Sequence, residues 1–337
     1  MQYVGIHTQM ARNNWNSIML LLMFPCIILG MLWVFCGVFG IQHTYTYDQY
    51  YNNYNDQYSL NTEAVNGLWL EIAPWAIVIV GIWFTIAYLF NAQMVQYATG
   101  AKPLERKENP RIYNMVENLC MSCGMPMPKV NIIEDPQLNA FASGINPKSY
   151  TVTLTRGIID YLDDDELEGV IAHELTHIRN RDTKVLIISI VFVGILSTLL
   201  TLLTRGVLRM FLWGNIGSSR RSNNKGNGGV IVVIIVAIIC AAIAYFLTLL
   251  TRFAISRKRE FMADAGSAEL TRNPRALASA LRKIASAPGL GHVEREDIAQ
   301  LYIIHPKKYT QSFFDKLQSL FSTHPSTEER IRILEQF

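Results

Sequence analysis

The sequence predicts an α-helical membrane protein with four apolar helices and a mainly α soluble domain that carries a small β-sheet. Half of the 337 residues are hydrophobic and only 17% are charged, against roughly 25% charged residues in an average globular chain. The deficit is concentrated in four long apolar runs instead of being spread along the chain. A helix of about 20 residues crosses a hydrocarbon core of about 30 Å, so each run is long enough to span a membrane.

The overall composition excludes three other classes of protein. A disordered chain would be poor in apolar residues, which this chain is not. Five cysteines are an ordinary, odd number for this length and do not indicate a disulfide scaffold. The net charge of +3 is too small to indicate nucleic-acid binding, so we expect the bilayer, and no nucleic acid, as a partner.

The first two apolar runs have the properties of membrane helices. The run from Ser17 to Ile41 has no charged residue. It exceeds the roughly 7–15 residues of a secretory signal core and lacks a small-residue cleavage site, so we expect an uncleaved anchor. The run from Leu68 to Phe90 has one charge, Glu71, at its edge. Its Pro74 lies near the start, where a membrane helix tolerates proline.

The distribution of basic residues predicts the orientation of these two runs. The segment from Gln42 to Gly67 contains no Lys or Arg. The segment after the second run carries Lys102, Arg106, Lys107 and Arg111. Because short cytoplasmic loops are rich in Lys and Arg, we expect the 42–67 loop outside, and the amino terminus and the following domain in the cytoplasm.

The third run, Val185 to Leu203, and the fourth, Val230 to Leu250, leave their topology open. The connection between them holds several basic residues and no acidic one. If both runs cross, this connection lies outside, against the charge rule. A hairpin that only dips into the membrane, or lies beside it, would keep this connection inside.

The soluble residues fall into two blocks. In the first, Asn109-Pro110 is typical of a helix start and Gly124 of its end. The second block is predicted to be helical from Ala254 to Leu270 and from Pro274 to Ser286, with a last helix capped by Ser326-x-x-Glu329.

Short apolar stretches in the first block, separated by Pro and Gly turns, predict a small sheet. These stretches are Val130 to Ile133, Ala140 to Ala142 and Tyr150 to Leu154. The expected organisation is two transmembrane helices and their loop in 1–95, a first half of the soluble domain in 96–184, a hydrophobic helix pair in 185–251 and a second half in 252–337.

The clearest chemical motif is His173-Glu174-Leu175-Thr176-His177, which follows an acidic cluster typical of a helix start. Two histidines four residues apart lie on one helix face, so both imidazoles can bind one zinc ion. Glu174, beside them, can accept a proton from a water molecule there. A solvated helix could match this pattern by chance, but apolar Val170 and Ile171 directly before it favour the zinc site.

Catalytic zinc sites hold three protein ligands and leave a fourth position open, so a further ligand is needed. We expect it in SRKREFMADAGSAEL, where Glu260 and Asp264 lie four residues apart on one helix face. A charged collar at the end of a membrane helix accounts for the basic residues of this segment, but not for two carboxylates on the same face.

Together with LNAFASG upstream and HPSTEERI near the carboxyl end, these motifs resemble the HtpX-like membrane zinc metallopeptidases, bacterial relatives of the type I CAAX prenyl proteases. The resemblance covers essentially the whole chain. It implies a gluzincin-like catalytic domain facing the cytoplasm, with one zinc ion per chain held by His173, His177 and Glu260. It also implies that Glu174 is the general base and that Asp264 supports a ligand histidine.

Two further roles, of Asn139 and His324, follow by analogy with the wider family. Asn139, in LNAFASG, matches an asparagine that holds the substrate backbone beside an edge strand, although an ordinary turn asparagine is an equal alternative. His324 matches a histidine that steadies the oxyanion, against the alternative of a plain loop histidine. Arg330 is expected to tie down the terminal helix.

The resemblance implies a multi-pass endopeptidase of the bacterial inner membrane that cleaves misfolded or damaged membrane proteins, or other unfolded polypeptides, during stress. An intramembrane protease is disfavoured because the charges around His173 to His177 would lie in hydrocarbon. An inactive scaffold is disfavoured because both histidines, Glu174 and Glu260 are present. A prenyl-protein protease would have additional helices that this chain lacks.

Overall fold

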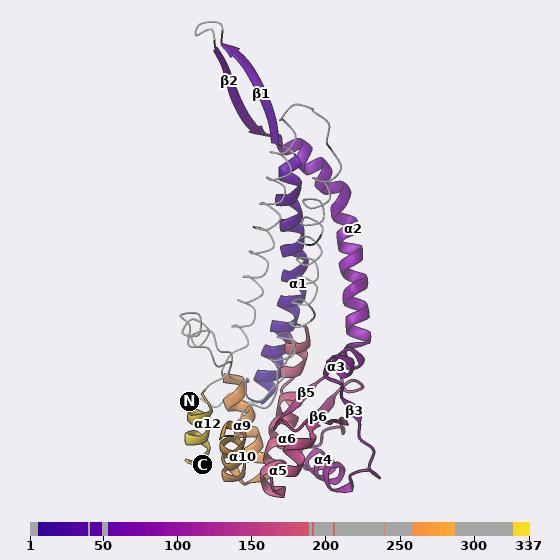
Figure 1. Cartoon of the computed structure of the whole chain (residues 1–337), viewed down its shortest axis with the longest axis vertical. Helices are drawn as coiled ribbons and strands as arrows, with labels where there is room; N and C mark the ends of the chain where they lie inside the picture. The colour runs from indigo at the N-terminus through magenta and orange to yellow at the C-terminus, as the bar shows by residue number, and fades with distance from the viewer. Residues whose placement is uncertain are drawn as a thin grey trace, which may run out of the picture. The chain divides into compact units, whose positions relative to one another are not determined.

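The computed structural model describes residues 6–39, 41–48, 53–188, 258–286 and 326–337, with the single residues 191, 205 and 239. The chain divides into two compact units (Figure 1). One is formed by Met1–Leu20, Ile86–Val191 and Thr251–Phe337, and the other by Leu21–Thr85 and Phe192–Leu250.

The second unit contains most of helices α1 (Ile6–Phe39) and α2 (Thr62–Leu89). By length and composition, both helices can cross a membrane, over Ala11–Val34 and Thr62–Leu89 respectively. Two indole N–H groups join them: Trp33 donates to Asn66 Oδ1 at 2.8 Å and Trp69 to the Leu29 carbonyl at 2.9 Å. The first two predicted membrane helices are therefore confirmed as long apolar helices.

The connection between these helices differs from the expected loop. Strands β1 (Ile41–Asp48) and β2 (Asn53–Leu60) form an antiparallel hairpin in which Ile41 pairs with Leu60 and Asp48 with Asn53. Thr and Tyr alternate over residues 44–47, and both favour extended backbone. The absence of Lys and Arg, from which an outside loop is predicted, carries no information on this alternation.

The third and fourth apolar runs, Val185 to Leu203 and Val230 to Leu250, lie almost wholly outside the described residues. The part of the chain that the structure describes therefore contains two of the four expected apolar helices.

The first unit contains a small sheet with strand order β3-β4-β6-β5. Strands β4 and β6 are parallel, and the other neighbouring pairs are antiparallel. The strands are β3 (Lys102–Pro103), β4 (Lys129–Ile133), β5 (Ala140–Ser143) and β6 (Thr151–Thr155). The three predicted strands are confirmed, whereas the two-residue β3 is too short to leave a pattern in the sequence.

The helices of the first unit begin and end largely where their capping residues predict. Asn109 accepts a hydrogen bond from the Ile112 N–H, and Ser326 accepts one from the Glu329 N–H. Asp163 and Glu166 form a complete capping box. The helices are α3 (Asn91–Thr99), α4 (Pro110–Ser122), α5 (Arg156–Tyr161), α6 (Asp164–Arg179), α9 (Lys258–Thr271), α10 (Pro274–Ser286) and α12 (Thr327–Leu334).

Helix α6 lies at the centre of this unit and packs against α4, α9, α10 and β5. Its apolar residues Leu167, Val170, Ile171 and Leu175 are fully buried in the main core cluster. The polar residues of its His-Glu-x-x-His motif are therefore also surrounded by protein, and each needs a partner.

Small residues bring α9 close to α6. A Cβ atom added to Gly266 would lie 2.4 Å from Thr176 Cγ2, so only glycine fits at this contact. One position further, the buried Ser267 hydroxyl donates to the Gly169 carbonyl at 2.7 Å. This close packing places the carboxylates of α9 beside the histidines of α6.

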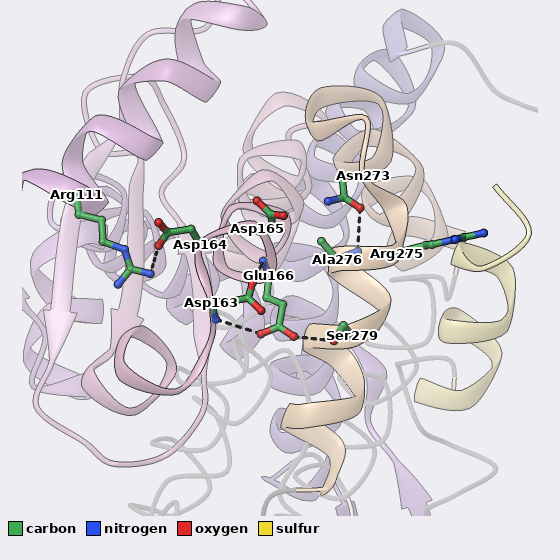
Figure 2. A pocket seen from close by; sticks show the side chains of 9 residues that line it. All are labelled: Arg111, Asp163, Asp164, Asp165, Glu166, Asn273, Arg275, Ala276 and Ser279. Atoms are coloured by element: carbon green, nitrogen blue, oxygen red, sulfur yellow. Dashed lines mark hydrogen bonds and ion pairs between the residues drawn. The ribbon is translucent and has the colours of Figure 1, made fainter.

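A surface pocket lies where α6 and α10 begin (Figure 2). Capping and ion pairing account for most of the polar groups that line it. Asp163 caps α6, Asn273 accepts from the Ala276 N–H, and Arg111 pairs with Asp164. Because its polar groups are engaged in the packing of helix ends, we assign this pocket no ligand.

Candidate metal centre

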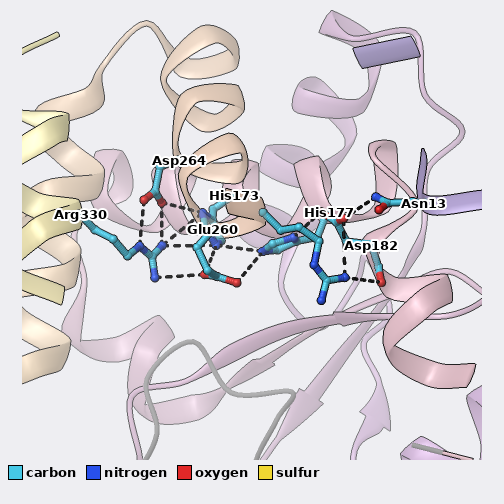
Figure 3. A network of polar contacts seen from close by, with 8 residues as sticks. Asn13, His173, His177, Asp182, Glu260, Asp264 and Arg330 are labelled. Carbon is cyan, nitrogen blue, oxygen red and sulfur yellow. Dashed lines mark hydrogen bonds and ion pairs between the residues drawn. The ribbon is translucent and has the colours of Figure 1, made fainter. Parts of the chain in front are cut away.

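Three side chains predicted as metal ligands converge between α6 and α9 (Figure 3). The Nε2 atoms of His173 and His177 lie 3.2 Å apart. The Glu260 carboxylate lies 3.6 Å from His173 Nε2 through Oε2 and 3.7 Å from His177 Nε2 through Oε1. The ligand atoms thus form a compact triangle, built from one turn of α6 and the first turn of α9.

The size of this triangle fits a tetrahedral zinc ion. Zinc binds imidazole nitrogen and carboxylate oxygen at about 2.0–2.2 Å. Two such ligand atoms at the tetrahedral angle are separated by about 3.4 Å. The separations of 3.2, 3.6 and 3.7 Å bracket this value, so a small shift of side chains suffices to hold the ion.

The charges of the surrounding side chains also favour a divalent cation. Among the described residues, four carboxylates face two guanidinium groups, which leaves two negative charges in excess once both histidines are neutral, as metal binding requires. Such an excess is costly in a buried cluster, and a divalent cation would balance it. The six side chains, all largely or wholly buried, are Glu174, Asp182, Glu260, Asp264, Arg259 and Arg330.

Asp264 and Arg330 form the far side of the site. Asp264 Oδ1 lies 3.0 Å from His173 Nδ1, on the opposite edge of the ring from the ligand triangle. The buried Arg330 guanidinium donates to both Asp264 oxygens, at 2.6 and 2.8 Å, and its Nη1 lies 3.3 Å from Glu260 Oε2. Arg330 thereby joins α12 to α9.

These contacts alter proton binding in the cluster. Burial acts to lower the pKa of His173, but hydrogen bonds to Asp264 and Glu260 outweigh it and raise the pKa to about 9. Burial raises the pKa of Asp264, but Arg330 and His173 outweigh it and hold that pKa below its usual range. Because imidazole binds metal only in its neutral form, metal binding would release the His173 proton.

Glu174 lies on the same turn of α6 as the two histidines and is 4% exposed. Burial raises the pKa of its carboxyl, against the lowering effect of both histidines. The backbone of Ala142, in β5, hydrogen-bonds to this carboxylate. Glu174 therefore lies between the candidate ligands and β5, an edge strand of the described sheet. A base in this position could act on a substrate bound to β5.

For two other predicted positions, the structure tests no role. Asn139 directly precedes β5 and is 4% exposed; its carbonyl accepts from the Thr155 N–H at 3.0 Å and hydroxyl at 2.9 Å. His324 lies outside the described residues. The role of each stays a prediction.

The sequence analysis missed the carboxylate beside the second histidine. Asp182 Oδ2 lies 3.0 Å from His177 Nδ1, and Asp182 in turn contacts Asn13 and Arg259. The only sequence signal for Asp182 is its position five residues after His177. Asn13 carries no comparable signal because it lies far away along the chain.

The chain is similar in sequence to known peptidases. The model of peptidase family M48 matches residues 106–337. A protein named Protease HtpX homolog from Bacteroides fragilis is 55% identical over 337 residues, covering 100% of both chains. Another of that name, from Tropheryma whipplei, is 39% identical over 251 residues, covering 74% of this chain and 80% of its own. Among solved structures, that of S. mikatae Ste24p matches with a TM-score of 0.45 and 19% identity, over 78% of this chain and 58% of that one.

Proposed function

The chain belongs to peptidase family M48, and from that premise we propose that it cleaves misfolded or damaged membrane proteins from the cytoplasmic side of a bacterial inner membrane. Membership makes the chain a metallopeptidase, and its long apolar helices fit a membrane protease. The observation that carries the proposal is the triangle of His173, His177 and Glu260 beside the buried Glu174.

We assign one zinc ion per chain to His173, His177 and Glu260. When bound, zinc polarises a carbonyl group and makes water more acidic. The carboxylate of Asp264 is assigned to the Nδ1–H of His173, which leaves Nε2 free to bind. Arg330 holds Asp264 in place through its two hydrogen bonds.

Glu174 is proposed as the general base. Its carboxylate accepts a proton from the attacking water and then gives it to the amine that leaves as the peptide bond breaks. The carboxylate is buried, and the backbone of Ala142 hydrogen-bonds to it. A base held in one position transfers protons efficiently because little further ordering is needed at the moment of reaction.

The substrate is proposed to bind as an additional strand along β5. The hydrogen bond from the Thr155 N–H to the Asn139 carbonyl sets the pairing, so the backbone groups of Phe141 and Ser143 face β6. Those of Ala140 and the carbonyl of Ala142 then face away from β6, where an extended peptide can pair with them, while the Ala142 N–H is directed to Glu174. Backbone pairing of this kind accepts many sequences, as a protease of misfolded proteins requires. Asn139 is proposed to hold the substrate at the start of this strand, and His324 to steady the oxyanion.

Proteolysis by purified full-length protein tests the proposal. An unfolded membrane protein should be cleaved in detergent with zinc, and cleavage should stop when a chelator is added. Glu174→Gln keeps the shape of the side chain but removes the base, so cleavage should be nearly abolished while about one zinc per chain remains bound. Glu168→Gln, on the same helix, is the matched control and should retain activity. Undiminished cleavage by Glu174→Gln would refute the mechanism.

The proposed orientation needs a separate test. Single cysteines introduced at Asn55 and at Lys107, in a chain without its natural cysteines, can be labelled in intact cells with a membrane-impermeant thiol reagent. We expect the cysteine at position 55 to react and the one at position 107 to be protected, because basic residues follow α2. The opposite labelling pattern would overturn the cytoplasmic assignment.

A further inference from the structure

Each candidate ligand histidine has its own carboxylate partner. Asp264, on α9, contacts Nδ1 of His173 at 3.0 Å. Asp182, just after α6, contacts Nδ1 of His177 at 3.0 Å. Asp182 is 3% exposed, so water does not compete for this contact.

A strained turn returns the chain toward His177. The Asn180 N–H makes the last helical hydrogen bond of α6, to the Thr176 carbonyl at 2.9 Å. Arg181 then adopts a left-handed conformation with φ 61°, which is uncommon for a residue other than glycine. Such strain persists only where the surrounding structure holds it. Here the turn directs the next side chain, Asp182, back to the histidine on the last turn of the helix.

The amino-terminal helix holds Asp182 from the other side. The Asn13 amide, on α1, donates one N–H to Asp182 Oδ1 at 2.6 Å and the other to the Asn180 carbonyl at 2.8 Å. Asn13 is 2% exposed. Arg259 adds a contact from its Nη1 to the Asp182 carbonyl at 3.3 Å. One amide thus joins α1 to both ends of the strained turn; Figure 3 shows its contact with Asp182.

We propose that Asp182 is the positioning residue of His177 and that Asn13, by holding Asp182, makes helix α1 part of the metal site. The Asp182 carboxylate accepts the Nδ1–H of His177, which fixes the ring and directs the Nε2 lone pair toward the ion. With Asp182 Oδ2 engaged by His177, Oδ1 is left to accept from Asn13. The proposal rests on the ligands assigned under the proposed function.

Metal binding by the full-length protein in detergent tests this proposal without measuring proteolysis. Zinc affinity is measured by competition with a chelator, and the absorption spectrum of the Co²⁺-loaded protein reports ligand geometry. Asp182→Asn keeps the shape but cannot accept from both partners, and should lower zinc affinity about 10–100-fold and alter the cobalt spectrum. Asn13→Ala removes a hydrogen bond to a charged group and should lower affinity about tenfold.

Two comparisons separate positioning from general loss of structure. Asn16→Ala, on the same helix three residues further along, should leave zinc affinity unchanged, because Asn16 makes no side-chain hydrogen bond to the described residues. Adding Asn13→Ala to Asp182→Ala should cause no further loss, because Asn13 acts through Asp182. Thermal melting identifies any variant that does not fold. If Asp182→Asn does not fold, the zinc affinities of Asn13→Ala and Asn16→Ala alone test the proposal.

The outcomes are distinct. If the wild-type chain binds zinc but Asp182→Asn keeps the same affinity and cobalt spectrum, Asp182 does not position His177. Equal losses in Asn13→Ala and Asn16→Ala would mean that α1 acts only through general stability, which overturns the role of Asn13. A wild-type chain that binds no zinc would overturn the proposed function itself, and this inference with it.

Discussion

The contact between Gly266 and Thr176 determines how close the carboxylates of α9 come to the histidines of α6. A Cβ added at Gly266 would lie 2.4 Å from Thr176 Cγ2, 2.8 Å from its Oγ1 and 3.2 Å from its Cβ. The Thr176 side chain resists rotation because it is β-branched and its hydroxyl donates to the Ala172 carbonyl at 2.8 Å. Gly266→Ala should therefore push α9 away from α6.

The size of this effect follows from the distances. Carbon atoms in contact lie about 3.5–4.0 Å apart, so the helices must separate by about 1 Å. Overpacking of this kind costs about 1–3 kcal/mol, offset by about 0.5–1 kcal/mol because alanine is the better helix former. We expect a net loss of up to about 2.5 kcal/mol in stability. A metal site tolerates only about 0.2 Å in its ligand distances, so zinc affinity should fall more than tenfold.

Thermal melting with and without zinc, together with chelator competition, measures both losses. Gly67→Ala, in α2, is the matched control because nothing lies within 4 Å of its added Cβ, and it should leave zinc affinity unchanged. Thr176→Ala in the Gly266→Ala background removes the two closest atoms and should restore much of the affinity. If Gly266→Ala melts and binds zinc as the wild type does, or if Thr176→Ala restores nothing, this contact does not set the spacing of the site.

Two further predictions concern single side chains. Glu260→Ala should lose most of its bound zinc and all cleavage. Asp264→Asn should weaken zinc affinity about 10–100-fold but leave a site that a high zinc concentration fills. If metal analysis shows the reverse, the roles assigned to Glu260 and Asp264 must be exchanged. Burial, with a contribution from Cys123, raises the pKa of Cys120 to about 12, so at about pH 8 only about one Cys120 thiol in 10⁴ is ionised. Iodoacetamide should therefore alkylate Cys123 well before Cys120 in the folded protein, and both cysteines at similar rates after unfolding. Mass spectrometry measures the two rates. Equal rates in the folded protein would contradict the burial of Cys120.

The sequence alone predicted the features whose causes are local. Asn109-Pro110 begins α4 because the capping side chain and the helix it caps are neighbours in the chain. His173 and His177 share one face because helix geometry relates residues four apart. For the same reason Glu260 and Asp264 were expected to act together, and both lie beside His173. The segment between α1 and α2 shows the limit of such predictions. Its alternating Thr and Tyr residues favour the observed hairpin, whereas its lack of basic residues predicts only on which side of the membrane it lies.

Only the tertiary structure decided which distant groups meet. Asn13 and Asp182 are 169 residues apart, and nothing in the composition or spacing of either segment indicates that they touch. The same is true of Arg330, an expected anchor of α12 whose carboxylate partners on α9 no local pattern could name. Helix starts, faces and zinc-binding spacing are set by interactions within a few residues, which a sequence displays directly. The positioning of His177 by Asp182 and Asn13 depends on packing between α1, α6 and α9, where close approach of backbones and burial of charge select the partners.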